Sequence, residues 1–291
     1  MHYLIGIDGG GTGCRAVVCD SKGTRLGVGN AGPANIMTNF EAAQTNILQA
    51  CENAFGDAGI SSAQMSSADA FLGLAGANSG KYAEQTKANM PFRNCIIETD
   101  AVTSLEGAIG SADGAVAIIG TGSVFIYRVN GKIKTVGGWG YMIGDLGSGS
   151  RLGRELLQES LLVFDGIHDG SDLTQKVLAH FNNDPNIMVE YAHKAQPGEF
   201  GTFAPLVFEY AKLRDPVAQK ILRQAVSDVE ETLDAILVDS SQKFCMLGGL
   251  GKLYADLINS NLRKRIQPPL GDAVSGAASL AKRNFSKVEA V

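Results

Sequence analysis

The chain has 291 residues, of which 45% are hydrophobic and 19% charged, so it can bury a large core in one large domain or two smaller ones. This composition excludes an intrinsically disordered protein. The 25 basic and 30 acidic residues give a net charge of −5, and no basic cluster is longer than 263–265, which argues against a nucleic-acid partner. The 36 glycines are about 12% of the chain, against a usual ~7%.

The cysteines and the hydropathy pattern indicate the cellular compartment of the protein. Five cysteines, at positions 14, 19, 51, 95 and 245, form no CxxC pair and no zinc spacing, which is typical of a reduced protein. No apolar stretch reaches the roughly 20 residues of a membrane span, and no basic segment of a signal peptide precedes residues 2–5. We therefore expect a soluble, cytoplasmic protein with no membrane partner and no iron–sulfur or zinc site.

The first third of the chain predicts strands and helices in alternation. Apolar runs and turn residues predict strands at 4–8, 14–20, from 26, 68–74 and 95–99, with helices at 40–55, 81–89 and 102–109. This order indicates a mixed sheet flanked by helices.

Near residue 110 the pattern restarts. Strands are predicted at 115–119, 123–129, 132–136 and 243–247, and helices at 148–164, 173–182, 200–212, 216–238, 253–261 and 273–282. Glycine loops at 9–13 and 120–122 each follow an apolar strand and precede a hairpin, roughly 110 residues apart. This self-similarity predicts two related lobes.

The two glycine loops are candidate phosphate sites. The first leads into a strand, whereas a dinucleotide-binding loop opens a helix, and no GK[ST] follows it as in a P-loop. Its amides can still bind phosphate oxygens, although a tight hairpin turn explains the loop equally well. Two such loops could hold the β- and γ-phosphates of a nucleotide during phosphoryl transfer.

Two aspartates follow predicted strands. Asp8, beside the first glycine loop, could hold Mg²⁺ through water, or it could cap a turn. Asp100 lies at the carboxyl end of the strand 95–99, where a carboxylate can accept a hydroxyl proton. Its alternative role is the N-cap of the following helix. Glu98 is a rival base, but Asp100 lies nearer the sheet edge.

Three further loops carry polar or aromatic groups. In GGWGYMIGD, residues 137–145, the indole of Trp139 could stack on a sugar while Asp145 binds hydroxyls, or Trp139 could anchor the core. Asn35 could bind a ligand or form a turn. The GGLG loop 248–251 suits close approach to a nucleotide, with helix capping as the alternative.

These segments occur in one order: GIDGGGTG, PAN, LGLAGAN, TDA, GTGS, GGWGYMIGD and GGLG. Together they resemble the N-acetylglucosamine and glucosamine kinases of the BadF/BadG/BcrA/BcrD ATPase family, within the actin-like sugar kinase and Hsp70 ATPase superfamily. The resemblance covers nearly the whole chain. It implies an α/β fold of two ribonuclease-H-like lobes, 1–110 and 111–291, with a central interlobe cleft. The last helix, 273–283, would pack back on the N-terminal lobe.

The resemblance also implies the reaction, the transfer of phosphate from ATP, with Mg²⁺, to the 6-hydroxyl of an amino sugar. Glucosamine is favoured, with N-acetylglucosamine close behind. It assigns Gly10, Gly11, Thr12, Thr121 and Gly122 to the ATP phosphates, Ala211, Gly248, Gly249 and Gly251 to adenosine, Asp8 to Mg²⁺, Asn35, Gly138, Trp139 and Asp145 to the sugar, and Asp100 to the activation of the 6-hydroxyl. Relatives commonly have an acidic residue where this chain has Leu146, which bears on sugar discrimination.

Other functions stay open. The family includes activator ATPases that act on a protein partner and hold an iron–sulfur cluster, but Cys245 has no partner cysteine nearby in the sequence. The zinc cysteines of the ROK sugar kinases are also missing. A sugar-sensing module without catalysis is a third alternative, which the presence of Asp8, Asp100 and Asp145 disfavours. A homodimer is open, because the sequence does not show the oligomeric state.

Overall fold

The computed structural model describes residues 2–239 and 241–286, and the chain divides into two compact units. The first unit comprises residues 1–114, 128–133 and 268–291, and the second 115–127 and 134–267. The sequence predicts a division near residue 110, with the last helix, 273–283, packing back on the first lobe, and the structure assigns residues 128–133 and 268–291 to the first unit. Met1, Ser240 and residues 287–291, which the predicted lobes include, lie outside the described residues.

The first unit contains a five-stranded mixed sheet. In the order β3-β2-β1-β4-β5, its strands are β3 (Arg25–Ala31), β2 (Cys14–Asp20), β1 (Tyr3–Gly9), β4 (Asp69–Leu74) and β5 (Asn94–Glu98). β1, β2 and β3 pair antiparallel, whereas β1, β4 and β5 run parallel. The carboxyl ends of the three parallel strands therefore share one edge, and ligands of open α/β sheets bind at this edge.

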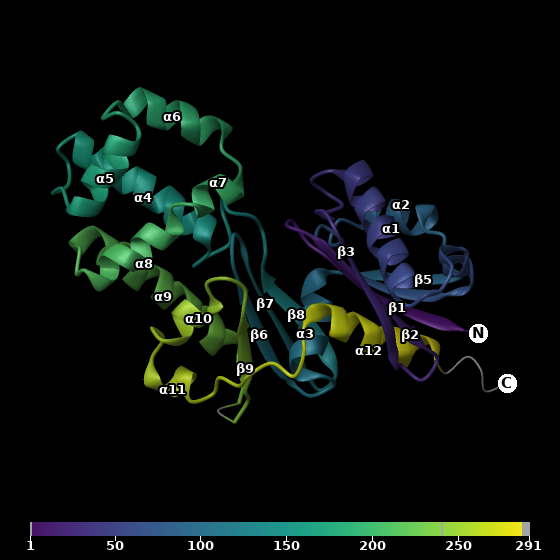
Figure 1. Ribbon diagram of the computed structural model, residues 1–291. Helices are drawn as coiled ribbons and strands as arrows, with labels where there is room; N and C mark the ends of the chain where they lie inside the picture. Colours follow the sequence, from purple (N-terminus) through teal and green to yellow (C-terminus); the bar gives the residue numbers. More distant parts are fainter. Residues whose placement is uncertain (1, 240, 287–291) are drawn as a thin grey trace. The chain divides into compact units, whose positions relative to one another are not determined.

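Helices cover both faces of this sheet (Figure 1). α1 (Phe40–Asp57) packs on one face with an apolar core that includes Ile5, Ile7 and Ile47. α3 (Asp100–Ile109) and α12 (Ala273–Phe285) pack on the other. A Cβ at Gly6 would lie 2.4 Å from the backbone nitrogen of Ala278, so glycine lets α12 lie directly on β1. The unit also contains α2 (Gly80–Asn89) and the 3₁₀ helix η1 (Ser62–Ser67).

The second unit carries most of a four-stranded sheet and a large helical layer. The strands, in the order β8-β7-β6-β9, are β8 (Lys132–Gly137), β7 (Ser123–Val129), β6 (Gly114–Ile119) and β9 (Phe244–Leu247). β6 and β9 are parallel. Asn130 and Gly131 join β7 to β8 with φ of 52° and 73°, as in a type I′ hairpin turn.

Eight helices of the described residues follow β8 in this unit. They are α4 (Gly149–Phe164), α5 (Asp172–His180), α6 (Pro185–Lys194), α7 (Pro197–Gly201), α8 (Ala204–Lys212), α9 (Pro216–Ile236), α10 (Gly251–Ala255) and α11 (Ser260–Arg263). The predicted cap of α9 is confirmed, because Asp215 accepts hydrogen bonds of 3.0 Å from the amides of Val217 and Ala218. The apolar stripe of α9 enters the core of the unit.

Three helical predictions need correction. The predicted helix 200–212 is two helices, α7 and α8, and the predicted helix 253–261 is also two, α10 and α11. The helix α6 was not predicted, because Met188 is its only buried residue and an apolar stripe is therefore missing. Its signal was the cap: Asp184 accepts from the amide of Asn186 at 2.8 Å, and Pro185 occupies the first turn.

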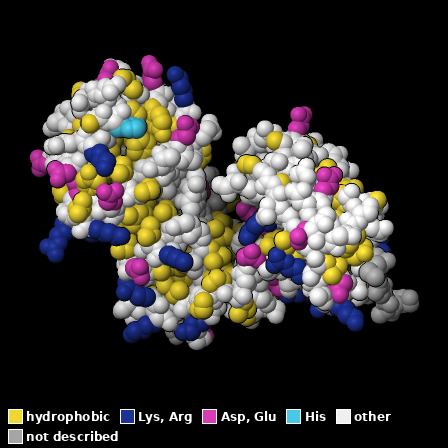
Figure 2. All heavy atoms as spheres, in the orientation of Figure 1, with side chains coloured by type: hydrophobic (Ala, Val, Ile, Leu, Met, Phe, Trp, Pro, Cys, Tyr) yellow, Lys and Arg dark blue, Asp and Glu magenta, His cyan; other side chains and the backbone are white. Residues whose placement is uncertain are grey.

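The surface mixes charges of both signs. On the face seen in Figure 2, basic and acidic side chains are interspersed over both units. Among the described residues, no helix combines the length and the apolar character needed to cross a bilayer.

Candidate active site

The first glycine loop joins β1 to β2 and is held by backbone hydrogen bonds. The Gly10 amide donates to the Gly13 carbonyl at 2.9 Å, and the Ala34 amide donates to the Gly10 carbonyl at 2.8 Å. A Cβ at Gly10 or Gly11 would meet no atom within 4 Å, so protein packing does not require glycine there. Gly11 and Thr12 are exposed. The loop thus presents open backbone and a hydroxyl, as phosphate binding requires.

Asp8 lies near the end of β1, and its carboxylate is held by an arginine. The Asp8 side chain is 17% exposed, and its Oδ2 accepts from Arg15 Nη2 at 2.6 Å. Arg15 Nη1 donates to Asp272 Oδ2 at 2.9 Å. Burial raises the pKa of Asp8, and the hydrogen bond from Arg15 opposes that rise. Arg15 therefore joins two carboxylates beside the glycine loop.

Asp100 opens α3 at the carboxyl end of β5. The N-cap of α3 is Thr99, so the alternative that made Asp100 the N-cap is wrong. Burial and, secondarily, the charge of Asp8 raise the pKa of Asp100 to about 6. A carboxylate with such a pKa is ionised at neutral pH and is a stronger base than an ordinary aspartate. The rival base Glu98 is exposed at the end of β5.

Asn35 follows the antiparallel strands β1, β2 and β3. It forms a turn, which is one of the two roles that the sequence allows for it. Its Oδ1 accepts from the amides of Met37 at 2.9 Å and Thr38 at 3.1 Å. Its Nδ2 has no hydrogen-bond partner among the described residues. The turn thus fixes the side chain and leaves two donors for a ligand.

In the second unit, the start of α4 supports the other glycine loop. The amides of Gly149 and Ser150 donate to the carbonyls of Gly120 at 2.8 Å and Thr121 at 3.1 Å. The hydroxyl of the fully buried Ser150 adds a bond of 2.7 Å to the Thr121 carbonyl. The side chain of Thr121 stays exposed.

The loop 137–145 is attached to this glycine loop through Asp145. Asp145 has a φ of 52°, and its Oδ1 accepts from the Gly140 amide at 3.1 Å. A Cβ at Gly122 would lie 2.8 Å from Asp145 Oδ2, so the absence of a side chain there makes room for the carboxylate. Burial raises the pKa of Asp145. Gly138, with a φ of 71°, donates from its amide to the Ser123 carbonyl at 3.0 Å.

Trp139 does not anchor the core. Its side chain is 77% exposed, and Met142 and Ile143 in the same loop are also exposed. Arg154 of α4 holds the backbone of this loop, because its Nη1 donates to the carbonyls of Tyr141 at 3.2 Å and Met142 at 2.7 Å. The loop thus presents an indole on a tethered backbone.

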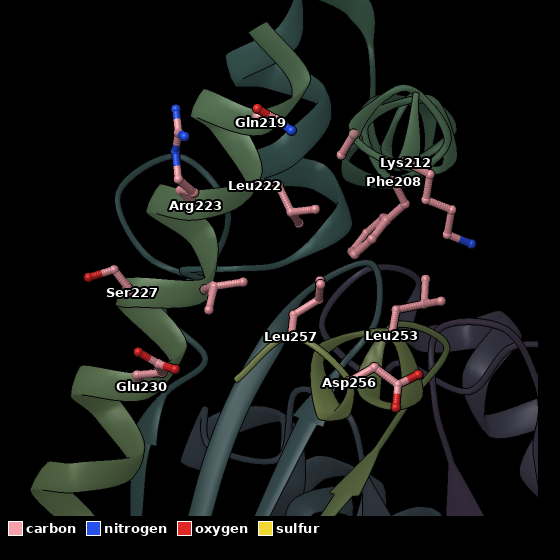
Figure 3. A pocket seen from close by; sticks show the side chains of 12 residues that line it. Phe208, Lys212, Gln219, Leu222, Arg223, Ser227, Glu230, Leu253, Asp256 and Leu257 are labelled. Atoms are coloured by element: carbon pink, nitrogen blue, oxygen red, sulfur yellow. The ribbon is translucent and has the colours of Figure 1, made fainter. Parts of the chain in front are cut away.

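A pocket of about 580 Å³ lies beside Ala211, between α8, α9 and α10. Figure 3 shows Phe208, Leu222, Leu253 and Leu257 directed into it, with polar groups such as Ser227 and Glu230 along its wall. The apolar lining suits the flat face of a heterocyclic base.

The GGLG loop joins β9 to α10, which contributes Leu253 to this pocket. Gly248 has a φ of 83°, and a Cβ there would lie 2.3 Å from the Ile119 carbonyl oxygen. The Leu250 amide also donates to that carbonyl at 3.0 Å. Gly251 is buried, whereas a Cβ at Gly249 would meet nothing within 4 Å. Of these glycines, Gly249 leaves its backbone open.

The donors present fit Mg²⁺. Among the described residues, no three His, Cys, Asp or Glu side chains converge, so the protein offers no closed metal cage. Asp8 and Asp100 are carboxylates, and the charge of Asp8 acts on Asp100. Mg²⁺ is usually held by one or two carboxylates together with water and phosphate oxygens, and a cation would relieve the repulsion between the two groups.

Sequence reasoning missed Arg15, Asp272, Ser150 and Arg154. Arg15 had a readable signal: if residues 10–13 form a hairpin turn, residue 15 lies opposite residue 8, as the observed register confirms. Asp272 and Ser150 belong to helix starts, where their capping chemistry hides any second role. Arg154 had no signal, because its contacts are backbone carbonyls in a loop.

The chain is similar to sugar kinases of one family. The BadF/BadG/BcrA/BcrD ATPase family matches residues 5–281. The chain is 35% identical over 283 residues to the glucosamine kinase GspK of Vibrio cholerae, covering 97% of this chain and 96% of that protein. It is 27% identical over 290 residues to the N-acetyl-D-glucosamine kinase of Dictyostelium discoideum, covering 90% and 88%.

A solved structure is similar to this chain in both sequence and fold. It is named as a proposed N-acetylglucosamine kinase from Chromobacterium violaceum, is 34% identical and has a TM-score of 0.88, covering 96% of this chain and 98% of that one. The fold class predicted from the sequence, α/β with two ribonuclease-H-like lobes of the actin-like ATPase type, is confirmed.

Proposed function

Because the chain belongs to the BadF/BadG/BcrA/BcrD ATPase family, we propose that it is an amino-sugar kinase that transfers the γ-phosphoryl group of ATP to the 6-hydroxyl of glucosamine. The observation that carries this function is the pair Asp8 and Asp100 at the carboxyl edge of a sheet, beside a glycine loop with open backbone. Phosphoryl transfer needs such a base and such a loop.

Asp100 acts as the base in this proposal. Its carboxylate takes the proton of the 6-hydroxyl as that oxygen attacks the γ-phosphorus. The bond between the γ-phosphorus and the β–γ bridging oxygen breaks, and ADP leaves. Asp8 would hold Mg²⁺ through water, and the ion would supply positive charge against the phosphates. Gly10, Gly11 and Thr12 offer amides and a hydroxyl to the phosphates.

The second unit supplies the remaining groups. Thr121 and Gly122 are assigned to the phosphates, and Ala211 with the 580 Å³ pocket and Gly248, Gly249 and Gly251 to adenosine. Gly138, Trp139 and Asp145 are assigned to the sugar, together with Asn35 of the first unit. The exposed indole supports stacking on the sugar, and the fixed carboxylate of Asp145 supports a hydrogen bond to a sugar hydroxyl.

The preference for glucosamine follows the more similar curated relative, with N-acetylglucosamine as the close alternative. A coupled ADP-release assay at saturating MgATP, with glucosamine, N-acetylglucosamine and glucose as acceptors, tests it. We expect the highest kcat/KM with glucosamine. A higher value with N-acetylglucosamine would reverse the preference, and no turnover with any hexose would overturn the kinase function.

A further inference from the structure

We propose that Arg15 is a positioning residue of the phosphoryl-transfer site: its guanidinium fixes the Asp8 carboxylate by tying it to Asp272 at the start of α12. This inference rests on the proposed function, because it gives Asp8 its role near the phosphates. Arg15 is not assigned to touch ATP or the sugar.

The geometry gives Arg15 two partners. Asp8 and Arg15 are directly opposite in the antiparallel register of β1 and β2. One guanidinium nitrogen donates to Asp8 Oδ2 at 2.6 Å and another to Asp272 Oδ2 at 2.9 Å. The planar guanidinium donates from two separate nitrogens, a geometry that the single ammonium nitrogen of lysine does not reproduce.

The Asp272 carboxylate is itself held in place by hydrogen bonds, so it can fix the position of Arg15. Its other oxygen, Oδ1, accepts from the Ser275 amide at 3.1 Å and from the Ser275 hydroxyl, so Asp272 is the N-cap of α12. The helix lies directly on β1, where Gly6 admits its backbone. The orientation of the Asp8 carboxylate is therefore coupled through Arg15 to a helix that packs on the same strand.

The Arg15 hydrogen bonds matter because several negatively charged groups lie at the proposed phosphoryl-transfer site. Asp8, Asp100 and Asp272 are carboxylates, and the proposed substrate adds phosphates. The positive charge of Arg15 offsets part of this repulsion, and the cross-strand bond holds one rotamer of Asp8. A misplacement of about 1 Å in such a site can lower turnover about 10²-fold.

The same sheet offers a matched control. Arg93 donates from Nη2 to Asp69 Oδ2 at 2.6 Å, and its side chain is 48% exposed against 44% for Arg15. Asp69 lies beside Leu4, at the edge of the sheet opposite the glycine loop. Both are arginine–aspartate ion pairs, but the Asp69 carboxylate is 1% exposed and also accepts from Arg93 Nε and Asn94 Nδ2, so Arg93→Met tests the loss of an ion pair away from the proposed site.

The experiment compares Arg15→Met, Arg15→Lys and Asp272→Asn with Arg93→Met in the full chain. One readout is kcat with its KM for sugar. The other is the Mg²⁺ concentration at half-maximum of the thermal shift caused by ADP, which needs no turnover. We expect Arg15→Met to lower kcat about 10²-fold, to raise that Mg²⁺ concentration about 10-fold and to leave the sugar KM within about twofold. Arg15→Lys should recover only part of the loss.

Asp272→Asn separates positioning from folding, because asparagine is also a good helix cap. It should lower kcat about threefold to 10-fold with an unchanged melting temperature. Arg93→Met should leave kcat and the Mg²⁺ dependence within about twofold. An Arg15→Met protein that folds and keeps both readouts within twofold would overturn the inference, as would an equal loss in Arg93→Met. If the unaltered protein turns over no hexose, the proposed function fails, and the Mg²⁺ readout still tests Arg15.

Discussion

In the proposed function Asp100 is the base, and burial and a neighbouring charge raise the pKa of its carboxyl. Its carboxyl lies at a strand end, where burial and Asp8 raise its pKa to about 6. The same surroundings that make it a better base disfavour its charged form in the folded protein. With Asp100 as the proposed base, activity and stability therefore make opposite demands on this residue.

Replacement of Asp100 by asparagine tests its chemical role. Asp100→Asn should lower kcat by about 10² or more, as the loss of a general base does, while the KM for sugar changes little. Glu98→Gln, which alters the exposed carboxylate two residues earlier, is the matched control and should retain near-normal turnover. Steady-state kinetics at pH 7.5 compare them. A normal kcat in Asp100→Asn would move the base elsewhere.

The pH dependence of the rate reports the same group. Below pH 6 Asp100 becomes protonated, so kcat/KM should fall about 10-fold per pH unit below that value and level off above it. N-acetylglucosamine is the suitable substrate, because it has no amine that titrates in this range. A flat profile between pH 5 and 7 in kcat/KM would contradict the assignment.

The free energy of unfolding should fall as pH rises, whereas the catalytic rate should increase. The pKa of Asp100 in the folded state, about 6, exceeds its ordinary value of 3.8, so the folded protein binds more protons between these values and loses stability as pH rises from about 4 to 6. At pH 7.5, Asp100→Asn should raise the free energy of unfolding by about 1–3 kcal/mol. Urea denaturation at pH 7.5 and 4 measures this, and the difference should shrink to about 0.5 kcal/mol at the lower pH.

At the scale of elements, helix α4 organises two loops at once. Its first amides and Ser150 hold the glycine loop 120–122, and Arg154 on its next turn holds the loop 137–145. Asp145 closes the arrangement, because its carboxylate lies against Gly122. A substitution in the loop 120–122 should therefore alter the conformation of the loop 137–145.

Gly122→Ala tests this connection. The new Cβ would lie 2.8 Å from Asp145 Oδ2 and displace the carboxylate, so the KM for sugar should rise about 10-fold or more. Gly198→Ala in α7 is the control, because a Cβ there meets nothing within 4 Å. Kinetics with varied sugar measure the effect. An unchanged sugar KM in Gly122→Ala would remove Asp145 from sugar binding.

At the scale of the whole molecule, the kinase and the ATPase switch differ in what they do without sugar. A kinase that excludes water from the phosphoryl group should hydrolyse MgATP alone about 10² times more slowly than it phosphorylates glucosamine. ADP release with and without sugar measures this ratio. Equal rates would favour the switch that acts on a protein partner.

The sequence predicts the order of elements and both glycine loops well, because apolar periodicity and glycine carry those signals. It does not predict α6, which has a single buried residue, or the placement of 128–133 in the first unit, which depends on tertiary contacts. In the site, Asp8 and Asp100 stand out as strand-end carboxylates. Ser150 and Arg154 do not, because they act on backbone carbonyls that become neighbours only after folding.

The open backbone at Gly10, Gly11 and Gly249 has a consequence for protein engineering. An alanine at these positions would clash with nothing, and none of them has the left-handed φ that only glycine favours. Such replacements usually stabilise a protein by about 0.4–1 kcal/mol. If these glycines bind phosphate and adenosine as proposed, a library of variants selected only for yield or heat resistance would accumulate alanine at these three positions and lose catalysis.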